Sequence, residues 1–464
     1  MRFLPTALVL SCLAAAAGLP AEVSAQSSRP AVSSIADAYG EAARRLIDAA
    51  LADSAAYKRL TQLTDRFGHR FSGSDNLERA LDWILAEMES DGLENVRGEP
   101  VLVPHWVRGS ESLELISPRR QALPMLGLGG SVGTSPEGVR AELLVVRSFD
   151  ELEARSHEAK GKIVLLNAPF VSYGETVTYR VQGAIAAARA GAVASLIRSV
   201  TPFSLRTPHT GQMLYDPWAP QIPHAAIAVE DAEMLQRMQE RGERIEVLLK
   251  MDAQTLPDVW SRNVVGEIVG WQHPEQVVVT GGHIDSWDLG TGAMDDGGGS
   301  VAAWEAVRLM RDLGLRPRRT VRVVLWTNEE NGLRGALAYR DAHLDELDDH
   351  ILAIESDAGV FKPRGFGFTG SAAAYEIVRE IGTLLEAIGA DDVRRGGGGA
   401  DIGPIMRKGV PGMGLRVDGD KYFWYHHTEA DTIDKLDPRE MAECVAAMAV
   451  MAYVVADLPE RLPR

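Results

Sequence analysis

The sequence predicts an α/β fold, in which a mostly parallel sheet lies between layers of helices and a smaller α/β domain is inserted. Two observations lead to this prediction. Downstream of Arg262, short apolar strands alternate with amphipathic helices, and such alternation requires crossover connections between parallel strands. Between residues 121 and 256, glycine and proline are frequent and the apolar runs are short, which indicates a separate small domain.

The first 25 residues have the features of a secretion signal. Arg2 provides a basic start, residues 3–19 are mostly apolar, and residues 23–25 resemble a small-residue cleavage site. We therefore expect an exported protein, either periplasmic or secreted. A lipid anchor at Cys12 is an alternative, because residues 9–12 loosely resemble a bacterial lipoprotein box. No later segment offers about 20 uninterrupted apolar residues, so no membrane span is expected.

Composition and charge narrow the range of partners. The 464 residues are enough for about two or three domains. A net charge of −17 would repel nucleic acid and anionic membranes, so neither is expected as a partner. Loss of Cys12 with the signal would leave only Cys444, and one thiol cannot form an intrachain disulfide. Export without disulfides favours a periplasm or a bacterial exterior.

Apolar periodicity predicts the elements in chain order. Residues 34–88 carry apolar side chains at spacings of three and four, which indicates helices, and residues 101–117 alternate like strands. In the inserted domain we expect a helix at 182–192 and strands at 141–146, 162–166, 194–197, 225–229 and 245–250. Farther on we expect strands at 277–280, 320–326, 351–354 and 412–417, and helices at 301–313 and 375–388.

Polar residues cluster directly after three of these strands. The clusters are His283-Ile284-Asp285, Asn328-Glu329-Glu330 and Glu355-Ser356-Asp357. Sites in open α/β sheets gather at the carboxyl ends of strands, so we expect the three clusters to meet. One acidic strand end could be solvated surface. Three in a partly dry cleft would repel one another unless cations neutralised them, which predicts a metal site.

The residue types indicate the metal and the chemistry. Histidine and carboxylate ligands without thiolates suit zinc with an open position for water. Two metals need a bridging carboxylate, and Asp295 is well placed because the surrounding glycines let the backbone approach closely. Glu329 and Glu330 are chain neighbours and point differently. One of them can bind metal while the other takes a proton from the attacking water.

Two further motifs accompany these clusters, namely residues 292–297 and His427-Thr428 followed by Asp431-Thr432. Together, the motifs resemble the co-catalytic zinc aminopeptidase and glutamate carboxypeptidase family. Residues 67–74, 104–106, 208–211 and 229–233 extend the resemblance over essentially the whole mature chain. It implies a three-layer zinc-exopeptidase fold with a protease-associated-like insert. The expected division is a signal peptide at 1–25, the N-terminal part of the catalytic domain at 26–120, the insert at 121–256 and the remaining catalytic domain at 257–464.

The resemblance also assigns roles to individual residues. It implies two zinc ions per subunit, one bound by His283 and Asp357, the other by Glu330 and His427, with Asp295 bridging. Glu329 would be the general base and later the acid, Asp285 would orient His283, and His426 would donate a hydrogen bond to the oxyanion. The resemblance further implies a cis peptide between Asp295 and Asp296, and a homodimer.

The expected function is hydrolysis of dipeptides or short peptides by a secreted metallo-exopeptidase, a carboxypeptidase or dipeptidase. An aminopeptidase that trims longer peptides stays open, because ligand motifs do not separate these branches. A receptor-like binding protein is the alternative from a different class, but such relatives have lost metal ligands and this sequence keeps all five. Histidines without nearby carboxylates are expected to be structural, with His209 the best exception, and the insert is expected to act as a lid that limits substrate length.

Overall fold

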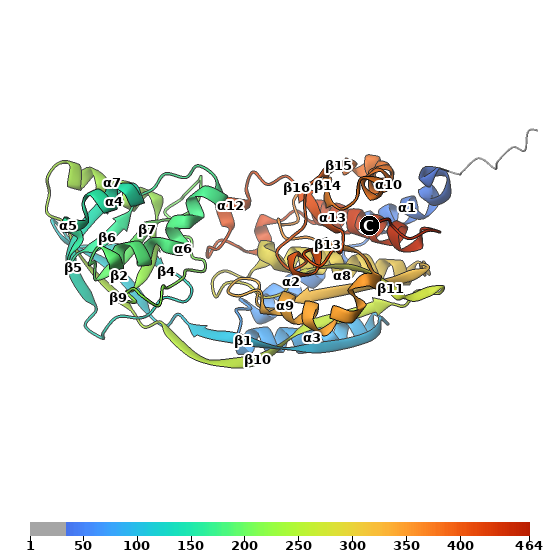
Figure 1. Ribbon diagram of the computed structural model, residues 1–464, viewed down its shortest axis with the longest axis horizontal. Helices are drawn as coiled ribbons and strands as arrows, with labels where there is room; N and C mark the ends of the chain where they lie inside the picture. The colour runs from blue at the N-terminus through green and yellow to red at the C-terminus, as the bar shows by residue number, and fades with distance from the viewer. Residues whose placement is uncertain (1–33) are drawn as a thin grey trace, which may run out of the picture.

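The computed structural model describes residues 34–464, so the predicted signal at residues 1–25 and the lipidation alternative at Cys12 lie outside the described residues. The described chain forms a larger and a smaller lobe, each built on one eight-stranded sheet (Figure 1). An antiparallel ribbon of β1 (Glu94–Val107) and β10 (Gln254–Ile268) runs between them. Among the described helices, none is both long and apolar enough to span a bilayer.

The sheet of the larger lobe is parallel at its centre and has antiparallel strand pairs toward both edges. Its strand order is β1-β10-β12-β11-β13-β16-β14-β15. The four central strands are parallel, namely β12 (Arg319–Trp326), β11 (His273–His283), β13 (His350–Glu355) and β16 (Gly412–Val417). Beyond them, β14 (Pro363–Thr369) is antiparallel to β16, and β15 (Asp392–Arg395) is parallel to β14. The predicted mostly parallel α/β sheet is confirmed.

Both faces of this sheet are covered. On β12, Val321 and Val323 lie in one hydrophobic core, whereas Val324 and Trp326 lie in another on the opposite face. The first core is filled by α1 (Ile35–Ala52), α2 (Ala55–Phe67), α3 (Asp75–Ser90), α8 (Gly298–Asp312), α10 (Ala372–Gly382) and α13 (Pro438–Asp457). The second is filled by α9 (Arg334–Ala342) and α11 (Gly403–Met406). Burial on both faces explains the continuous apolar runs of these strands.

The smaller lobe repeats this design on a smaller scale. Its strands are β2 (Glu111–Ser117), β3 (Gln121–Leu123), β4 (Met125–Gly127), β5 (Val139–Val146), β6 (Ile163–Leu166), β7 (Ala194–Arg198), β8 (His224–Ile227) and β9 (Glu246–Met251). Its helices are α4 (Phe149–Ala154), α5 (Ser156–Ala159), α6 (Tyr173–Arg189) and α7 (Val229–Glu240). Helices α6 and α7 pack on opposite faces, so the lobe has its own core.

The structure differs from the sequence expectation at several boundaries. The second sheet takes in β2, which precedes the predicted insert start at residue 121. Helix α6 begins at Tyr173 rather than 182, because the side chain of Ser172 caps it by accepting a hydrogen bond from the backbone N–H of Glu175. The helix predicted at 375–388 ends at Gly382 and continues as the 3₁₀ turn η3 (Thr383–Ile388), consistent with the low helix propensity of glycine.

Candidate metal centre

The predicted metal ligands gather at the carboxyl edge of the larger sheet. His283 is the last residue of β11, Glu330 follows β12, and Asp357 follows β13. Asp295 lies in the short turn η1 (Ala293–Gly297) between β11 and α8. His427 follows the short helix α12 (Tyr422–Tyr425), in the segment that connects β16 to α13. Long-range folding therefore brings together five residues that span almost 150 positions of sequence.

Asp295 lies between two sets of possible donor atoms. On one side its Oδ1 is 3.3 Å from His283 Nε2, and that nitrogen is 3.5 Å from Asp357 Oδ1. On the other side its Oδ2 is 3.4 Å from His427 Nε2, and that nitrogen is 3.0 Å from Glu330 Oε2. Each carboxylate oxygen of Asp295 thus lies near an imidazole that is itself close to a further carboxylate. This arrangement could hold two cations that share Asp295.

The buried carboxylates of this centre fit positively charged ligands. Asp295 Oδ2 and Glu330 Oε1 are buried and accept no hydrogen bond within the described chain. Burial and repulsion from Asp295 raise the pKa of Glu330 well above its ordinary value. Burial likewise raises the pKa of Asp357. A cation would neutralise this repulsion, and nitrogen and oxygen donors without thiolates are a set that zinc accepts.

Asp285 connects the ends of two neighbouring strands. Its carboxylate accepts hydrogen bonds from the backbone N–H groups of Glu329, at 3.0 Å, and Glu330, at 3.3 Å. Its backbone carbonyl lies 3.0 Å from His283 Nδ1, and its carboxylate Oδ1 lies 3.6 Å from the same nitrogen. One residue therefore orients the imidazole of His283 and holds the turn that carries the two glutamates. The expected contact to His283 is present, and the contact to the glutamate turn is additional.

Glu329 lines the same cleft as Glu330 and Asp357. Burial, together with repulsion from Asp357, raises the pKa of Glu329 to about 8. Its backbone is fixed by Asp285, and the preceding Asn328 adopts a positive φ of 63°. Asn328 is anchored by its own side chain, which donates to Ser72 Oγ at 3.0 Å. A carboxylate held in this way beside the donor atoms can exchange a proton with a water molecule in the cleft.

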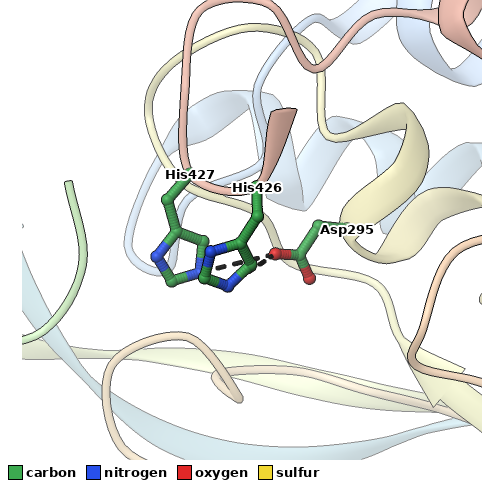
Figure 2. A group of neighbouring side chains, drawn as sticks. All are labelled: Asp295, His426 and His427. Atoms are coloured by element: carbon green, nitrogen blue, oxygen red, sulfur yellow. Dashed lines mark ion pairs between the residues drawn. The ribbon is translucent and has the colours of Figure 1, made fainter. Parts of the chain in front are cut away.

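His426 lies beside His427 and faces Asp295 (Figure 2). The two imidazole rings stack with centroids 3.5 Å apart, and His426 Nε2 is 3.6 Å from Asp295 Oδ2. Tyr422, four residues earlier in α12, lines the same cleft, and burial together with the charge of Asp295 raises the pKa of its hydroxyl well above the ordinary value. Sequence patterning alone does not single out Tyr422. The run of aromatic residues at 422–425, directly before the two histidines, was the signal that could have identified it.

Two further buried residues hold the loop that carries Asp295. The carboxylate of Asp431 accepts hydrogen bonds from the backbone N–H groups of Met294, at 2.7 Å, and Asp295, at 3.2 Å. The guanidinium of Arg70 is fully buried and donates to the carbonyls of Ile284, Thr291 and Gly292 at 2.7–2.8 Å. Arg70 was recognised only as part of a motif, because nothing in its sequence neighbourhood indicates which loop it contacts. The peptide between Asp295 and Asp296 is cis, as the resemblance implied.

The cleft above these groups is lined by both lobes. Its volume is about 250 Å³, and its walls include Asp295, Glu329, Glu330, Asp357 and the two histidines. From the smaller lobe, Tyr173 and Arg180 of α6 complete the lining. Arg180 donates to the hydroxyl of Tyr173 at 2.9 Å, and its Nη1 is 3.4 Å from His427 Nδ1. The cleft is therefore an interface between the lobes.

Comparisons with known proteins agree with the predicted family. A family model described as Peptidase family M28 matches residues 263–452. Carboxypeptidase Q of Xenopus laevis is 51% identical over 429 residues, covering 92% of each chain, and that of Homo sapiens is 50% identical over 428 residues, covering 92% of this chain and 91% of the human protein. These relatives bear out the expected resemblance to the glutamate carboxypeptidases over nearly the whole described chain.

Solved structures extend this agreement to three dimensions. The crystal structure of a Peptidase M28 precursor from Shewanella amazonensis has a TM-score of 0.88 at 35% identity, covering 92% of this chain and 99% of its own. A zinc aminopeptidase from Bacillus subtilis has a TM-score of 0.67 at 23% identity, covering 88% of this chain and 98% of its own, and this likeness supports the fold alone. By the extent of its similarity to curated relatives and by its fold, the chain belongs to peptidase family M28.

Proposed function

We propose that this metallo-exopeptidase is an exported, two-zinc enzyme that hydrolyses dipeptides or short peptides. Metallo-exopeptidase activity follows from the family and from the 51% identity to carboxypeptidase Q. The number of ions, the residue roles and the substrate length are our proposal. The observation that carries it is the position of Asp295, whose two carboxylate oxygens face separate imidazole–carboxylate pairs.

Five residues would hold the ions. His283 and Asp357 would bind one, Glu330 and His427 the other, and Asp295 would bridge them. When bound, two zinc ions polarise the scissile carbonyl and lower the pKa of the attacking water. The unpartnered oxygens of Asp295 and Glu330 support this assignment, because buried carboxylate oxygens without donors are otherwise costly.

The protein's own groups would move the protons and orient the substrate. Glu329 accepts a proton from the attacking water and then passes it to the leaving amine. Asp285 keeps the imidazole of His283 in its binding orientation and holds the Glu329 turn in place. His426 and Tyr422 also line the cleft, where an N–H or O–H can donate to the developing oxyanion.

The size and charge of the cleft favour short substrates. Its volume of about 250 Å³ is below the roughly 300–1,000 Å³ of typical small-molecule sites. Among the described residues that line it, Arg180 is the only lysine or arginine. Guanidinium groups bind carboxylates in a bidentate manner, so we assign the free α-carboxylate of the substrate to Arg180. This places the scissile bond near the C-terminus of the peptide.

Hydrolysis assays on the purified full chain test this function. After zinc is restored, we expect two zinc ions per chain by elemental analysis and faster cleavage of a dipeptide than of a tetrapeptide. A matched dipeptide amide should be a poorer substrate, because it lacks the carboxylate. Faster cleavage of tetrapeptides would favour an aminopeptidase that trims longer chains, and folded, zinc-loaded protein without hydrolysis would favour a binding protein.

The exported location and the homodimer belong to the same proposal. Both rest on the signal-like residues 1–25 and on the resemblance. N-terminal sequencing of the protein recovered from the cell exterior or periplasm should find a start near residue 26. Light scattering after size-exclusion chromatography should give twice the mass of the mature chain. Retention of Met1 in the cytosolic fraction, or a monomeric mass, would contradict the respective statement.

A further inference from the structure

A turn of the smaller lobe reaches the segment that carries His427. The backbone N–H of Thr210 donates to the carbonyl of His427 at 3.0 Å. In return, His427 Nδ1 lies 3.2 Å from the carbonyl oxygen of Thr210. The neighbouring His209 donates from Nδ1 to the carbonyl of His426 at 2.7 Å. His209 and Thr210 are both buried, so water does not compete for these bonds.

These contacts suit a His427 ring in which Nε2 is free to bind a cation. Its Nε2 faces Asp295 and Glu330, and a nitrogen that binds a cation carries no proton. The proton of the neutral ring is then on Nδ1, and the Nδ1–H group donates a hydrogen bond to the carbonyl of Thr210. Arg180 Nη1 lies 3.5 Å from the same carbonyl oxygen and can donate to the second lone pair of that oxygen. A carbonyl of the smaller lobe thus selects the tautomer and fixes the orientation of the ring.

The turn is itself held by the smaller lobe. The backbone N–H of His209 donates to Ser199 Oγ at 2.9 Å, and Thr210 Oγ1 donates to the carbonyl of Gly127 at 2.8 Å. The N–H of Gly129 donates to the carbonyl of Gly211 at 3.0 Å. His427 therefore takes its position from strands and loops of the other lobe.

Other contacts dock the same segment onto the smaller lobe. Tyr173 stacks on Phe423 with ring centroids 4.8 Å apart, and Phe203 stacks on Trp424 at 4.3 Å. Thr201 Oγ1 donates to the carbonyl of Phe423 at 2.6 Å. His283 differs, because its Nδ1 partner is Asp285 of its own lobe. The two halves of the centre are thus supported by different lobes.

We propose that the smaller lobe completes one of the two metal positions: through Thr210 and His209 it positions His427, so that binding of the ion between Glu330 and His427 depends on lobe docking. The ion between His283 and Asp357 does not depend on it. This inference rests on the proposed two-zinc function. It gives the smaller lobe a role in metal affinity. A lid that only restricts substrate length would differ, because changes in the turn at 208–211 would then leave the zinc content unaltered.

Zinc retention by variants of His209 tests the inference. His209→Leu removes the donor to His426, whereas His209→Asn keeps an N–H near the position of Nδ1. His224→Leu is the matched control, because His224 is equally buried in the same lobe and its Nδ1 lies near the carbonyl of Ser195. Zinc per chain is measured after dialysis against increasing chelator, with circular dichroism and thermal melting to establish folding.

We expect His209→Leu to lose one of two zinc ions at a chelator concentration about 10–100-fold lower than the wild type does, as for other residues that orient metal ligands. His209→Asn and His224→Leu should resemble the wild type. Thr201→Val is a milder change that replaces the hydroxyl at the docking contact with a methyl group. It should weaken binding of the same ion, and it replaces His209→Leu in the test if that variant does not fold. Folded His209→Leu or Thr201→Val with wild-type retention of both ions would overturn the inference. A wild-type protein that binds fewer than two ions would instead refute the two-zinc function.

Discussion

Asp285 accepts a 3.0 Å hydrogen bond from the backbone N–H of Glu329 and so links the end of β11 to the turn after β12. The same residue contacts His283 through its backbone carbonyl. A proposed metal ligand and the proposed general base are therefore held by a single buried residue. A change at Asp285 should affect metal binding and proton transfer together.

Asp285→Ala should weaken zinc binding by about 10–100-fold and also lower kcat after zinc is restored in excess. The affinity falls because the backbone N–H of Glu330 loses its carboxylate partner and His283 loses the negative charge 3.6 Å from its Nδ1. The value of kcat falls because the Glu329 turn loses its anchor. Chelator titration measures the first effect, and steady-state kinetics at saturating zinc measures the second. Asp48→Ala, at an exposed position on α1, should change neither. Full recovery of kcat with excess zinc would contradict the role in holding Glu329.

Glu329→Gln should retain zinc and lose about 10²–10⁴-fold in kcat. The amide keeps the shape of the side chain but cannot accept the proton of the attacking water, and general acid–base help is typically worth this factor. Glu330→Gln is the informative comparison, because loss of a ligand should reduce zinc content as well. Elemental analysis and dipeptide kinetics separate the two variants. Near-normal turnover by Glu329→Gln would rule out its assignment as the base.

Arg180→Leu should remove the preference for a free α-carboxylate. Hydrogen bonds to charged groups contribute about 1.5–3 kcal/mol, so kcat/KM for a dipeptide should fall by roughly 10- to 150-fold. The matching dipeptide amide should be cleaved almost as well as before. Because Arg180 also contacts Thr210, zinc content is checked in the same preparations. An unchanged ratio between the acid and the amide would show that another group binds the carboxylate.

Arg70→Leu should destabilise the folded protein by about 3 kcal/mol or more. The substitution leaves the carbonyls of Ile284, Thr291 and Gly292 buried without donors, and each such group costs about 1–3 kcal/mol. Urea unfolding of the metal-free protein measures the loss. Arg66→Leu, a change at an exposed position in the last turn of α2, should stay within about 0.5 kcal/mol. Equal stability of the two variants would contradict the role of Arg70 as the anchor of the ligand loop.

The free energy of unfolding should also decrease as the pH falls, because of His224. Burial lowers the pKa of His224 from 6.5 to about 4, so the folded protein holds this imidazole neutral while the unfolded chain protonates it near pH 6.5. Between pH 6.5 and about 4, the unfolded state therefore binds more protons than the folded state. The stability that the neutral His224 contributes is fully present above pH 6.5 and is lost as the pH falls to about 4. A shift of this size corresponds to about 3 kcal/mol. His224→Leu should show a shallower decrease in unfolding free energy than the wild type over this range, and parallel curves would contradict the assignment.

Local sequence determined much of the architecture and most of the centre. The apolar runs of β11, β12 and β13 predict strands that are buried on both faces, and polar residues directly after them must lie at one sheet edge. This reasoning identified His283, the two glutamates and Asp357, because strand and cluster are adjacent in the chain. His427 came instead from motif resemblance, and Asp295 came from the glycines around it together with that resemblance. Both residues lie in irregular segments whose path is not set by periodicity.

The tertiary structure decided which distant groups hold the centre in place. Arg70 carries no periodic or compositional signal that identifies its partners, because its hydrogen bonds join segments far apart in sequence. The same holds for Thr210, whose contribution is a backbone carbonyl that any residue type could offer. Residue chemistry and strand periodicity are local properties and can be read along the chain. The docking of the smaller lobe on His427 depends on the packing of two separate cores, so only the folded molecule specifies it.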